Sequence, residues 1–459
     1  MTGRMPIADL RDSRAVGRVL ASMGLTPSSA HQKAATFSRL AEALLGAGIR
    51  PGQRVEALFV PGRIEVLGKH TDYAGGRSLV AAADRGFCLL AVPGDGPAVE
   101  MTDAARGQTC RFDLRADLEV PAESWFNYPM TVGRRLARNF AGPLRGGRIV
   151  FDSDLPPAAG MSSSSAMIVA TFLAIDAMNR LSDSRTYHEN VNSREDLAAY
   201  LAAVENGQSF RALAGDRGVG TSGGSEDHTA ILCCRAGAMG QYSYCPVRFE
   251  RAVPVPDGYG FAVASSGVVA EKTGAAMQNY NLASRLAGAV AELWRRSTGR
   301  DDPHIAAALA SAPDAAERMR EILQQPSADF TRAQLLNRFE HLLAESEEVV
   351  PAAGDALARG DMAEFGLLVD RSQGLAESLL GNQVPQTVFL ARSARELGAA
   401  AASAFGAGFG GSVWALVREA EAEEFLSAWR SRYAAAFPEH SERSAFFLTH
   451  AGPGAVRIA

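Results

Sequence analysis

Four consecutive serines, Ser162 to Ser165, stand in the stretch LPPAAGMSSSSAM, between a run that predicts a strand and an apolar run that predicts a helix. They fall at the expected helix N-terminus, where backbone N–H groups are unpaired and the helix dipole is positive. Such a position binds anions, and the hydroxyls could reach a phosphate or Mg²⁺. Capping needs one serine, and four exceed that need. The stretch lacks GxxxxGK[ST], which excludes a Walker-type loop.

Two carboxylates have neighbours that suggest chemistry. On a 3.6-residue period Glu205 shares a face with Leu197 and Leu201, and a carboxylate on an apolar face must be paired or bind a cation. A salt bridge to an arginine and a Mg²⁺ site both remain open. Asp227 lies in the glycine-rich turn GGSED, ahead of the run HTAILCC, which predicts a strand. It could act as a base or cap the turn.

The stretch GRIEVLGKHTDYAGGRSL packs hydrogen-bonding side chains into a short turn between apolar runs. These are Arg63, Lys69, His70, Asp72 and Tyr73. That density suits a polar, hydroxylated ligand, although a solvated loop often carries similar charge.

The glycines from Gly406 to Gly411 satisfy the pattern GxGxxG. A dinucleotide-binding fingerprint needs a helix directly after the loop, and here SVWALV predicts a strand. A protein kinase needs a lysine on the following strand, and no lysine follows Lys272. Taken alone, the pattern is therefore best interpreted as a tight turn between elements.

The elements that must position these residues are mixed. Residues 1–50 predict amphipathic helices. RVEALFV and RIEVLG predict two strands separated by a turn at Pro61–Gly62, and SLVAAA and GFCLLAV predict two more. Residues 271–400 are helix-rich, and strands return near 404–417. This mixture without βαβ alternation indicates an α+β fold. The length favours two domains, which we expect at 1–250, including the 1–50 extension, and 251–459.

Composition excludes several classes of function. No stretch approaches 18 apolar residues, so we expect no membrane association, and the N-terminus does not resemble a secretory signal. A net charge of −5 is unfavourable for nucleic-acid binding. Five cysteines without C-x-x-C spacing indicate reduced thiols and a cytoplasmic protein. Nothing in the sequence points to a protein partner. Of 46 basic residues only three are lysines, and one of them, Lys69, lies in the polar turn.

Together and in this order, three of these stretches resemble the galactokinase branch of the kinases named for galactose, homoserine, mevalonate and phosphomevalonate. PGRIEVLGKHTDYAGG is similar to the sugar-binding signature, PPAAGMSSSSA to the phosphate loop, and FGAGFGGS to the third motif. WFNY and QNYN are weaker matches, and GGSEDH lies where the family carries its catalytic aspartate.

The resemblance implies a two-domain α+β fold with the active site between the domains, and transfer of the ATP γ-phosphoryl to the anomeric hydroxyl of a sugar. It implies that Asp227 takes the hydroxyl proton and that Arg63 stabilises negative charge. It places Ser164 and Glu205 at magnesium positions. It implies that ATP is contacted by Trp125, Gly160, Ser162, Ser163, Ser164, Ser165 and Ala166. It implies that the sugar, galactose or a related hexose, is contacted by Lys69, His70, Asp72, Gly224 and Tyr280.

The chain departs from the family pattern at several positions. Glu65 replaces the usual Asn, Ser403 a usual Arg, and His228 a usual Gln. Lys69 replaces a Glu that contacts a sugar hydroxyl near C6, which exchanges an acceptor for a three-donor cation. An acidic sugar such as galacturonate would suit Lys69, whereas pairing of Lys69 with Glu65 would leave a neutral sugar. A non-catalytic sugar sensor is a third, less favoured reading, because the catalytic and phosphate-loop residues are all present.

Overall fold

The computed structural model describes residues 4–121, 124–156, 160–268, 274–327 and 329–458, and of 274–280 only the course of the helix. The helices are α1 (Ser13–Ser22), α2 (Pro27–Gly46), α3 (Asn127–Asn139), α4 (Ser163–Asn179), α5 (Arg185–Asn190), α6 (Arg194–Asn206), α7 (Glu226–Cys233), α8 (Gly274–Thr298), α9 (Ile305–Leu309), α10 (Ala315–Ile322), α11 (Arg332–Leu343), α12 (Val350–Ala358), α13 (Met362–Leu375), α14 (Pro385–Glu396) and α15 (Ala422–Ala436). The strands are β1 (Met5–Pro6), β2 (Arg54–Leu67), β3 (Arg77–Pro93), β4 (Ala98–Asp103), β5 (Gln108–Asp113), β6 (Gly147–Ser153), β7 (Ala238–Ser243), β8 (Arg248–Pro254), β9 (Tyr259–Ser265), β10 (Ala401–Phe405), β11 (Ser412–Arg418), β12 (Ala445–Thr449) and β13 (Val456–Arg457).

The first sheet is built around two long antiparallel strands. Its order is β1-β2-β3-β6-β4-β5, with β13 paired to β2 and β7 paired to both β3 and β8. The prediction of two strands over 54–67 is wrong, because β2 continues through Pro61–Gly62 with a register shift before Arg63. A proline is tolerated at such an irregularity. Likewise, β3 joins the two strands predicted on either side of Asp84.

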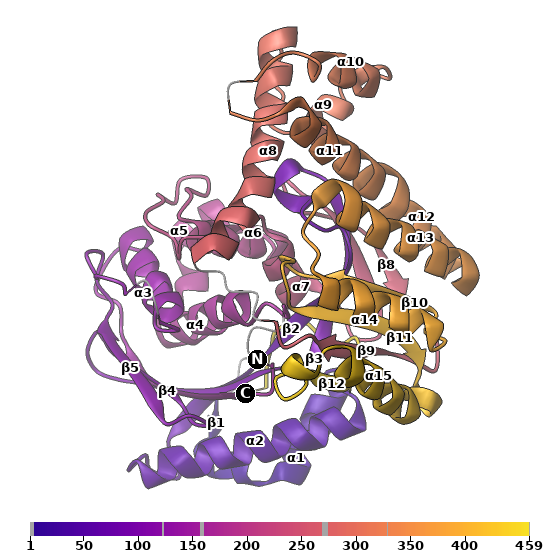
Figure 1. The fold of residues 1–459 in the computed structure, drawn as a ribbon. Coiled ribbons are helices and arrows are strands. Elements are labelled where there is room, and N and C mark those ends of the chain that lie inside the picture. Colours follow the sequence, from indigo (N-terminus) through magenta and orange to yellow (C-terminus); the bar gives the residue numbers. More distant parts are fainter. Residues whose placement is uncertain (1–3, 122–123, 157–159, 269–273, 328, 459) are drawn as a thin grey trace.

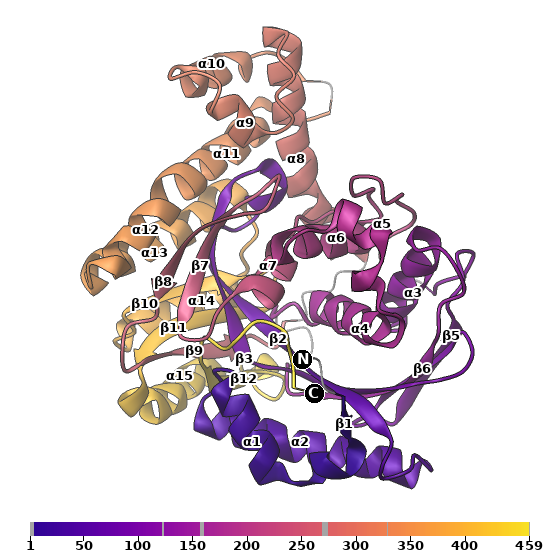
Figure 2. The ribbon, with the colours of Figure 1, turned by 180° about the vertical axis from the view of Figure 1, so that it is seen from behind.

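Alternating side chains of β2 give this sheet two buried faces. Ala57 and Phe59 pack against α1 and α2, while Leu58 and Val60 belong to the core that includes α4. The predicted helices within residues 1–50 are thus confirmed. As Figures 1 and 2 show, α1 and α2 lie beneath the sheet, on the side away from α4.

The second sheet has the order β10-β11-β9-β12. One face packs against α14 and α15 through Leu390, Trp429 and Tyr433. The other face joins the core of the first sheet, through Phe405 and Trp414 among others. In Figure 1, α8 to α11 project beyond both sheets as a helical lobe. The mixture of helices and sheets confirms the α+β prediction. The predicted boundary at 250/251 remains a prediction, and β8 crosses that point.

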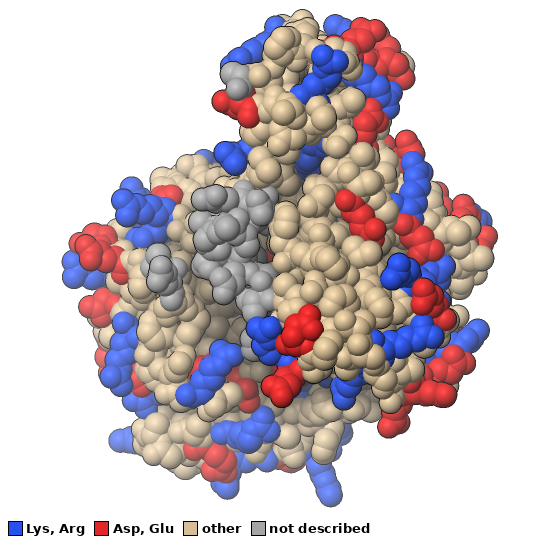
Figure 3. All heavy atoms as spheres, in the orientation of Figure 1, with Lys and Arg blue, Asp and Glu red and all other residues tan. Residues whose placement is uncertain are grey.

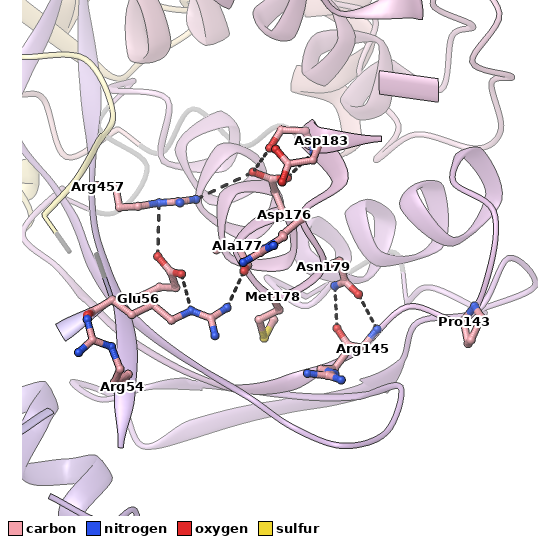
Figure 4. A pocket seen from close by; sticks show the side chains of 13 residues that line it. Arg54, Glu56, Pro143, Arg145, Asp176, Ala177, Met178, Asn179, Asp183 and Arg457 are labelled. Carbon is pink, nitrogen blue, oxygen red and sulfur yellow. Dashed lines mark hydrogen bonds and ion pairs between the residues drawn. The ribbon is translucent and has the colours of Figure 1, made fainter. Parts of the chain in front are cut away.

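The two ends of the chain meet beside the C-terminal end of α4. Glu56, which is 3% exposed, accepts from Arg4 Nε at 2.8 Å, and Arg457 Nε lies 3.4 Å from its other oxygen. Arg4 Nη2 also donates to Ala177 O at 2.8 Å, at the end of α4. Figure 4 shows these contacts beside a polar hollow. Glu56 therefore links the first and last strands of the described chain to one helix.

The surface shown in Figure 3 mixes charges of both signs. Lys and Arg side chains lie among Asp and Glu side chains, without a broad area of one sign on that face. Among the residues that the structure describes, no helix combines the length and apolar character needed to cross a membrane.

Candidate active site

An arginine and an aspartate face each other where β2 meets the start of α7. Arg63 Nε donates to Asp227 Oδ1 at 2.7 Å, and Arg63 is 3% exposed. Burial opposes the guanidinium charge, but Asp227 and Glu65 raise the pKa of Arg63 above its ordinary value. The structure therefore holds a charged arginine against Asp227. The ring of Phe405, at the end of β10, lies 5.8 Å from the Arg63 guanidinium carbon.

The prediction of a strand over HTAILCC is wrong, because these residues belong to α7. Glu226 and Asp227 occupy its first turn, where the helix dipole favours carboxylates. Asp72 Oδ2, from the distant polar turn, accepts from the backbone N–H of Glu226 at 3.0 Å and satisfies a first-turn donor. The helix start thus fixes Asp227 and the polar turn relative to each other.

The serine loop and the third glycine motif lie side by side. α4 begins at Ser163, as predicted, and Ser162 has a left-handed conformation with φ of 56°. Arg63 Nη1 donates to Gly160 O, which joins the loop to the Arg63–Asp227 pair. A Cβ added to Gly406 would lie 3.0 Å from Gly160 O, so the two backbones approach closely. The tight turn predicted before SVWALV is confirmed, with β11 following it.

Glu205 lies between the serine helix and α7. Its Oε2 accepts from Ser165 Oγ at 2.9 Å and lies 3.1 Å from His228 Nε2. The same Ser165 hydroxyl lies 3.4 Å from Asp227 Oδ2. Ser165 therefore connects the carboxylates of Glu205 and Asp227. Carboxylate and hydroxyl oxygens beside a phosphate-binding helix end are suitable ligands for Mg²⁺. Ser164 precedes them in the first turn of α4 and is 8% exposed.

The polar turn closes around His70 and Asp72. His70 has φ of 58°, and its Nε2 lies 3.2 Å from Ala407 O in the third motif. Because a carbonyl can only accept, Nε2 carries the proton, and Nδ1 accepts from Tyr73 Oη at 3.0 Å. Burial and Arg338 lower the pKa of His70 to about 4, so the ring is neutral at physiological pH. Burial also raises the pKa of Asp72 above its ordinary value.

Gly224 lies directly against Asp72. A Cβ at Gly224 would lie 2.1 Å from Asp72 Oδ2, so a larger residue there would displace this carboxylate. The structure thus brings His70, Asp72 and Gly224 to the same region as Arg63 and Asp227. Their roles in binding and catalysis stay a prediction. Tyr280 lies in α8, but its side chain falls outside the described residues.

Lys69 is buried between the two sheets, at 0% exposure. Its Nζ donates to Ser403 Oγ at 2.8 Å and lies 3.5 Å from Ser372 Oγ. Ser403 in turn donates to Gln373 Oε1 at 2.9 Å, and Ser372 to Glu345 Oε1 at 2.9 Å. Lys69 therefore links the polar turn to α13 and β10 of the second half of the chain.

Glu65 and Glu226 form a carboxyl pair behind the Arg63–Asp227 pair. Both are 5% exposed, and their side chains hydrogen-bond to each other. Burial raises the pKa of both groups, well above its ordinary value for Glu226. The charges of Arg63 and Lys69 counteract this shift at Glu65. Two carboxyl groups can form this hydrogen bond only if one is protonated, so the pair carries about one negative charge.

Trp125 lies apart from these groups, just before α3. Its ring packs edge-on against Phe126 and Phe151, with centroids 4.7 and 5.5 Å away, and Nε1 donates to Gln108 at 3.0 Å. The ring is partly exposed. The proposed adenine contact is not tested by these neighbours and stays a prediction.

Sequence reasoning missed several residues of this region. Glu226 could have been noticed as a second acid beside Asp227. Ser372, Gln373 and Glu345 approach Lys69 only through the tertiary fold, and no local pattern marks them.

Comparisons with known proteins agree with this arrangement. Three family models match: the galactokinase galactose-binding signature at residues 52–93, the GHMP kinases N terminal domain at 127–215 and the GHMP kinases C terminal domain at 355–435. The galactokinase of Chloroflexus aggregans is 28% identical over 82% of this chain and 87% of its own length. The galactokinase of Roseiflexus sp. is 28% identical over 90% of this chain and 94% of its own length.

Solved structures show the same fold. The Lactococcus lactis galactokinase complexed with galactose superposes with a TM-score of 0.73 at 21% identity, covering 91% of this chain and 99% of the other. A mevalonate kinase superposes with a TM-score of 0.51 at 14% identity, covering 86% of this chain and 99% of the other.

The fold and the ordered motifs define the class of protein: the chain belongs to the GHMP kinase family, whose members are ATP-dependent kinases. Within that family it is galactokinase-like, since the galactose-binding signature covers the strand of Arg63 and the turn of Lys69, His70 and Asp72.

Proposed function

We propose that this protein is a cytoplasmic sugar-1-kinase that transfers the γ-phosphoryl group of ATP to the anomeric hydroxyl of galactose or a related neutral hexose. The observation that carries the proposal is the Arg63–Asp227 pair, 2.7 Å apart. Arg63 is buried and donates to Gly160 O of the serine loop, and Glu226, next to Asp227, donates its backbone N–H to Asp72 of the polar turn. The serine loop and the polar turn are where a phosphate and a hydroxylated ligand would bind. The five free cysteines support a reducing compartment.

The chemistry assigned to the pair follows from charge and position. The anomeric oxygen attacks the γ-phosphorus, the bond from that phosphorus to the bridging oxygen of ADP breaks, and the hydroxyl proton passes to Asp227. Arg63, fixed by Asp227 and Gly160 O, stabilises negative charge that develops on the transferred group. Positioning and electrostatic stabilisation supply most of the catalysis in phosphoryl transfer.

The phosphates and a magnesium ion are assigned to the start of α4. Gly160, Ser162 to Ser165 and Ala166 would contact the phosphates, and Trp125 the adenine. Ser164 and Glu205 would hold Mg²⁺, which supplies charge neutralisation for the phosphates. The fit rests on the Glu205 carboxylate, bonded to Ser165 at 2.9 Å beside the helix N-terminus.

His70, Asp72, Gly224, Tyr280 and Lys69 would contact the sugar. For Lys69, two of the three N–H groups are directed to Ser403 and Ser372, which leaves one for a substrate hydroxyl. The Glu65 carboxyl group lies close enough for Lys69 to lower its pKa. The lysine charge is thus compensated within the protein, which favours a neutral hydroxyl over a carboxylate as its ligand.

A substrate panel with ATP and Mg²⁺ tests the proposal. We expect turnover of galactose and not of galacturonate. Asp227→Asn should lower kcat by about 10³-fold while ATP affinity changes less than threefold, because the variant loses proton acceptance but keeps the fold. Wild-type turnover in Asp227→Asn would contradict the assigned role. Binding of ATP and sugar by the wild-type protein without any turnover would instead indicate a sensor.

A substitution at Lys69 tests the sugar contact separately. Lys69→Met keeps the aliphatic stem and removes the donors, so KM for galactose should rise about tenfold, equivalent to one lost hydrogen bond to a charged donor. The matched control is Lys33→Met, because Lys33 is likewise buried, at 3% exposure, but pairs with Asp154 beside α2. An unchanged KM for galactose in Lys69→Met would remove Lys69 from the sugar site.

A further inference from the structure

A cavity lies beside His70, between α8, α11 and the segment 379–382. Its volume is about 390 Å³. We propose that this cavity binds a small molecule that carries a carboxylate on an apolar body, at a position that borders the proposed sugar site and shares His70 with it. The side chain of Arg338 lines the cavity from α11.

Arg338 is a buried cation without a carboxylate partner. It is 1% exposed, and within the described part of the chain it makes no ion pair. Its partners are neutral acceptors: Nε donates to Ala283 O at 3.2 Å, Nη1 to His341 Nδ1 at 3.3 Å, and Nη2 to His70 O and to Tyr73 Oη. A guanidinium has five N–H groups, and these contacts account for four.

The groups nearest to Arg338 cannot supply the missing charge. Burial lowers the pKa of His341 well below its ordinary value and that of His70 to about 4, so both rings are neutral at physiological pH. Burial raises the pKa of Tyr73 to about 12, so its hydroxyl is protonated. The Tyr73 ring, 5.6 Å from the guanidinium carbon, gives a weak cation–π contact. A buried arginine is normally paired with an anion, which points to an anionic ligand.

The remaining walls indicate the rest of the ligand. The amides of Gln334, Asn337 and Asn382 line the cavity together with six apolar side chains, which are Leu282, Ala283, Leu286, Leu379, Leu380 and Phe409. A concave site of this volume, mostly apolar with a few convergent polar groups, is typical of small-molecule pockets. An acid of roughly ten heavy atoms would place its carboxylate at Arg338 and its apolar part against the leucines.

A ligand in this cavity should affect sugar binding at the neighbouring site. Arg338 holds the backbone carbonyl of His70, whose ring lies 3.2 Å from Ala407 O in the third motif. Phe409, two residues further on, lines the cavity. A ligand that engages Arg338 would therefore lie against His70 of the proposed sugar site and Phe409 of the third motif, and we expect it to change KM for the sugar without competing for the site.

Benzoate is a suitable probe, with benzamide as its neutral counterpart of the same shape. Calorimetric titration of the full chain, without ATP or sugar, should show benzoate binding at least tenfold tighter than benzamide. Arg338→Met should abolish this preference, whereas Arg332→Met, at an exposed arginine of the same helix, should retain it. Because binding is measured without turnover, this result does not depend on the proposed kinase activity.

A variant that fills the cavity tests the proposal independently, in case Arg338→Met does not fold. Leu379→Trp leaves Arg338 in place and should lose benzoate binding while KM and kcat for galactose change less than threefold. Equal affinity for benzoate and benzamide would overturn the proposal. So would benzoate binding that survives Leu379→Trp and is displaced competitively by galactose, because the probe would then occupy the sugar site.

Discussion

Replacing Glu226 by glutamine should make the stability of the protein less sensitive to rising pH. The Oε1 atoms of Glu226 and Glu65 are buried, and in the part of the chain that the structure describes no N–H or hydroxyl group donates to either of them. Since the two side chains bond to each other, one of them carries a proton in the folded protein. In the unfolded chain both carboxyl groups lose their protons above their ordinary pKa of 4.5.

This single proton determines how strongly the free energy of unfolding depends on pH. An acid whose pKa is raised by folding contributes stability that is fully present below its unfolded pKa and is lost as pH rises through its folded pKa. While the folded protein retains the proton and the unfolded chain does not, each pH unit costs about 1.4 kcal/mol. The wild-type protein should therefore lose stability as pH rises from 5.5, and the largest loss that a single proton allows by pH 7.5 is about 2.7 kcal/mol.

Glu226→Gln should remove most of that slope. The glutamine amide can donate to Glu65 without taking up a proton, so the hydrogen bond persists at every pH. Urea unfolding at pH 5.5, 6.5 and 7.5 measures the difference directly. Glu423→Gln, at an exposed position of α15, is the matched control and should follow the wild type. Parallel pH curves for Glu226→Gln and the wild type would refute the shared proton.

Two further predictions concern contacts that hold the chain ends. Glu56→Ala should lower the free energy of unfolding by about 1–2 kcal/mol, because the Arg4 and Arg457 contacts are partly exposed and screened, while Glu42→Ala, at an exposed pair with Arg11, should change it by less than about 0.5 kcal/mol. Urea titrations measure the free energy of unfolding of both variants, and equal losses for Glu56→Ala and Glu42→Ala would contradict the prediction. His450 Nδ1 lies 3.1 Å from Asp84 Oδ2, and this hydrogen bond raises the pKa of His450. Its contribution is complete below the unfolded pKa of about 6.5 and is lost as pH rises through the raised value. His450→Gln should therefore lower the melting temperature more at pH 6 than at pH 9, and an equal effect at both would contradict this linkage.

The serine-rich start of α4 could be predicted from the sequence because its signals are local. An apolar helix with four serines at its start requires no tertiary information, and α4 begins within that run, at Ser163. The tight turn before SVWALV was equally accessible, since a run of glycines followed by alternating apolar residues predicts a turn and then a strand. The order of the three motifs then sufficed for the family.

Features that depend on distant contacts could not be predicted. The run HTAILCC has the apolar character of a strand, but it starts a helix whose first turn is capped by Asp72 from another part of the chain. The proline and glycine at 61–62 suggest a reversal, yet the neighbouring β3 keeps β2 in one sheet across them. Arg338 was one arginine among many, and only burial distinguishes it.

Lys69 illustrates how the environment of a charge decides what it can recognise. From the sequence, a lysine in place of an acid suggested an acidic sugar. In the fold its ammonium lies at 0% exposure, donates to Ser403 at 2.8 Å and lies near the Glu65 carboxyl group, which shares about one negative charge with Glu226. A substrate carboxylate added there would meet a cation that is already compensated and a nearby carboxylate that repels it. A neutral hydroxyl needs only the remaining N–H. If Lys69 contacts the sugar as proposed, the substitution at position 69 changes the direction of a hydrogen bond to the sugar rather than the charge of the sugar that the site accepts.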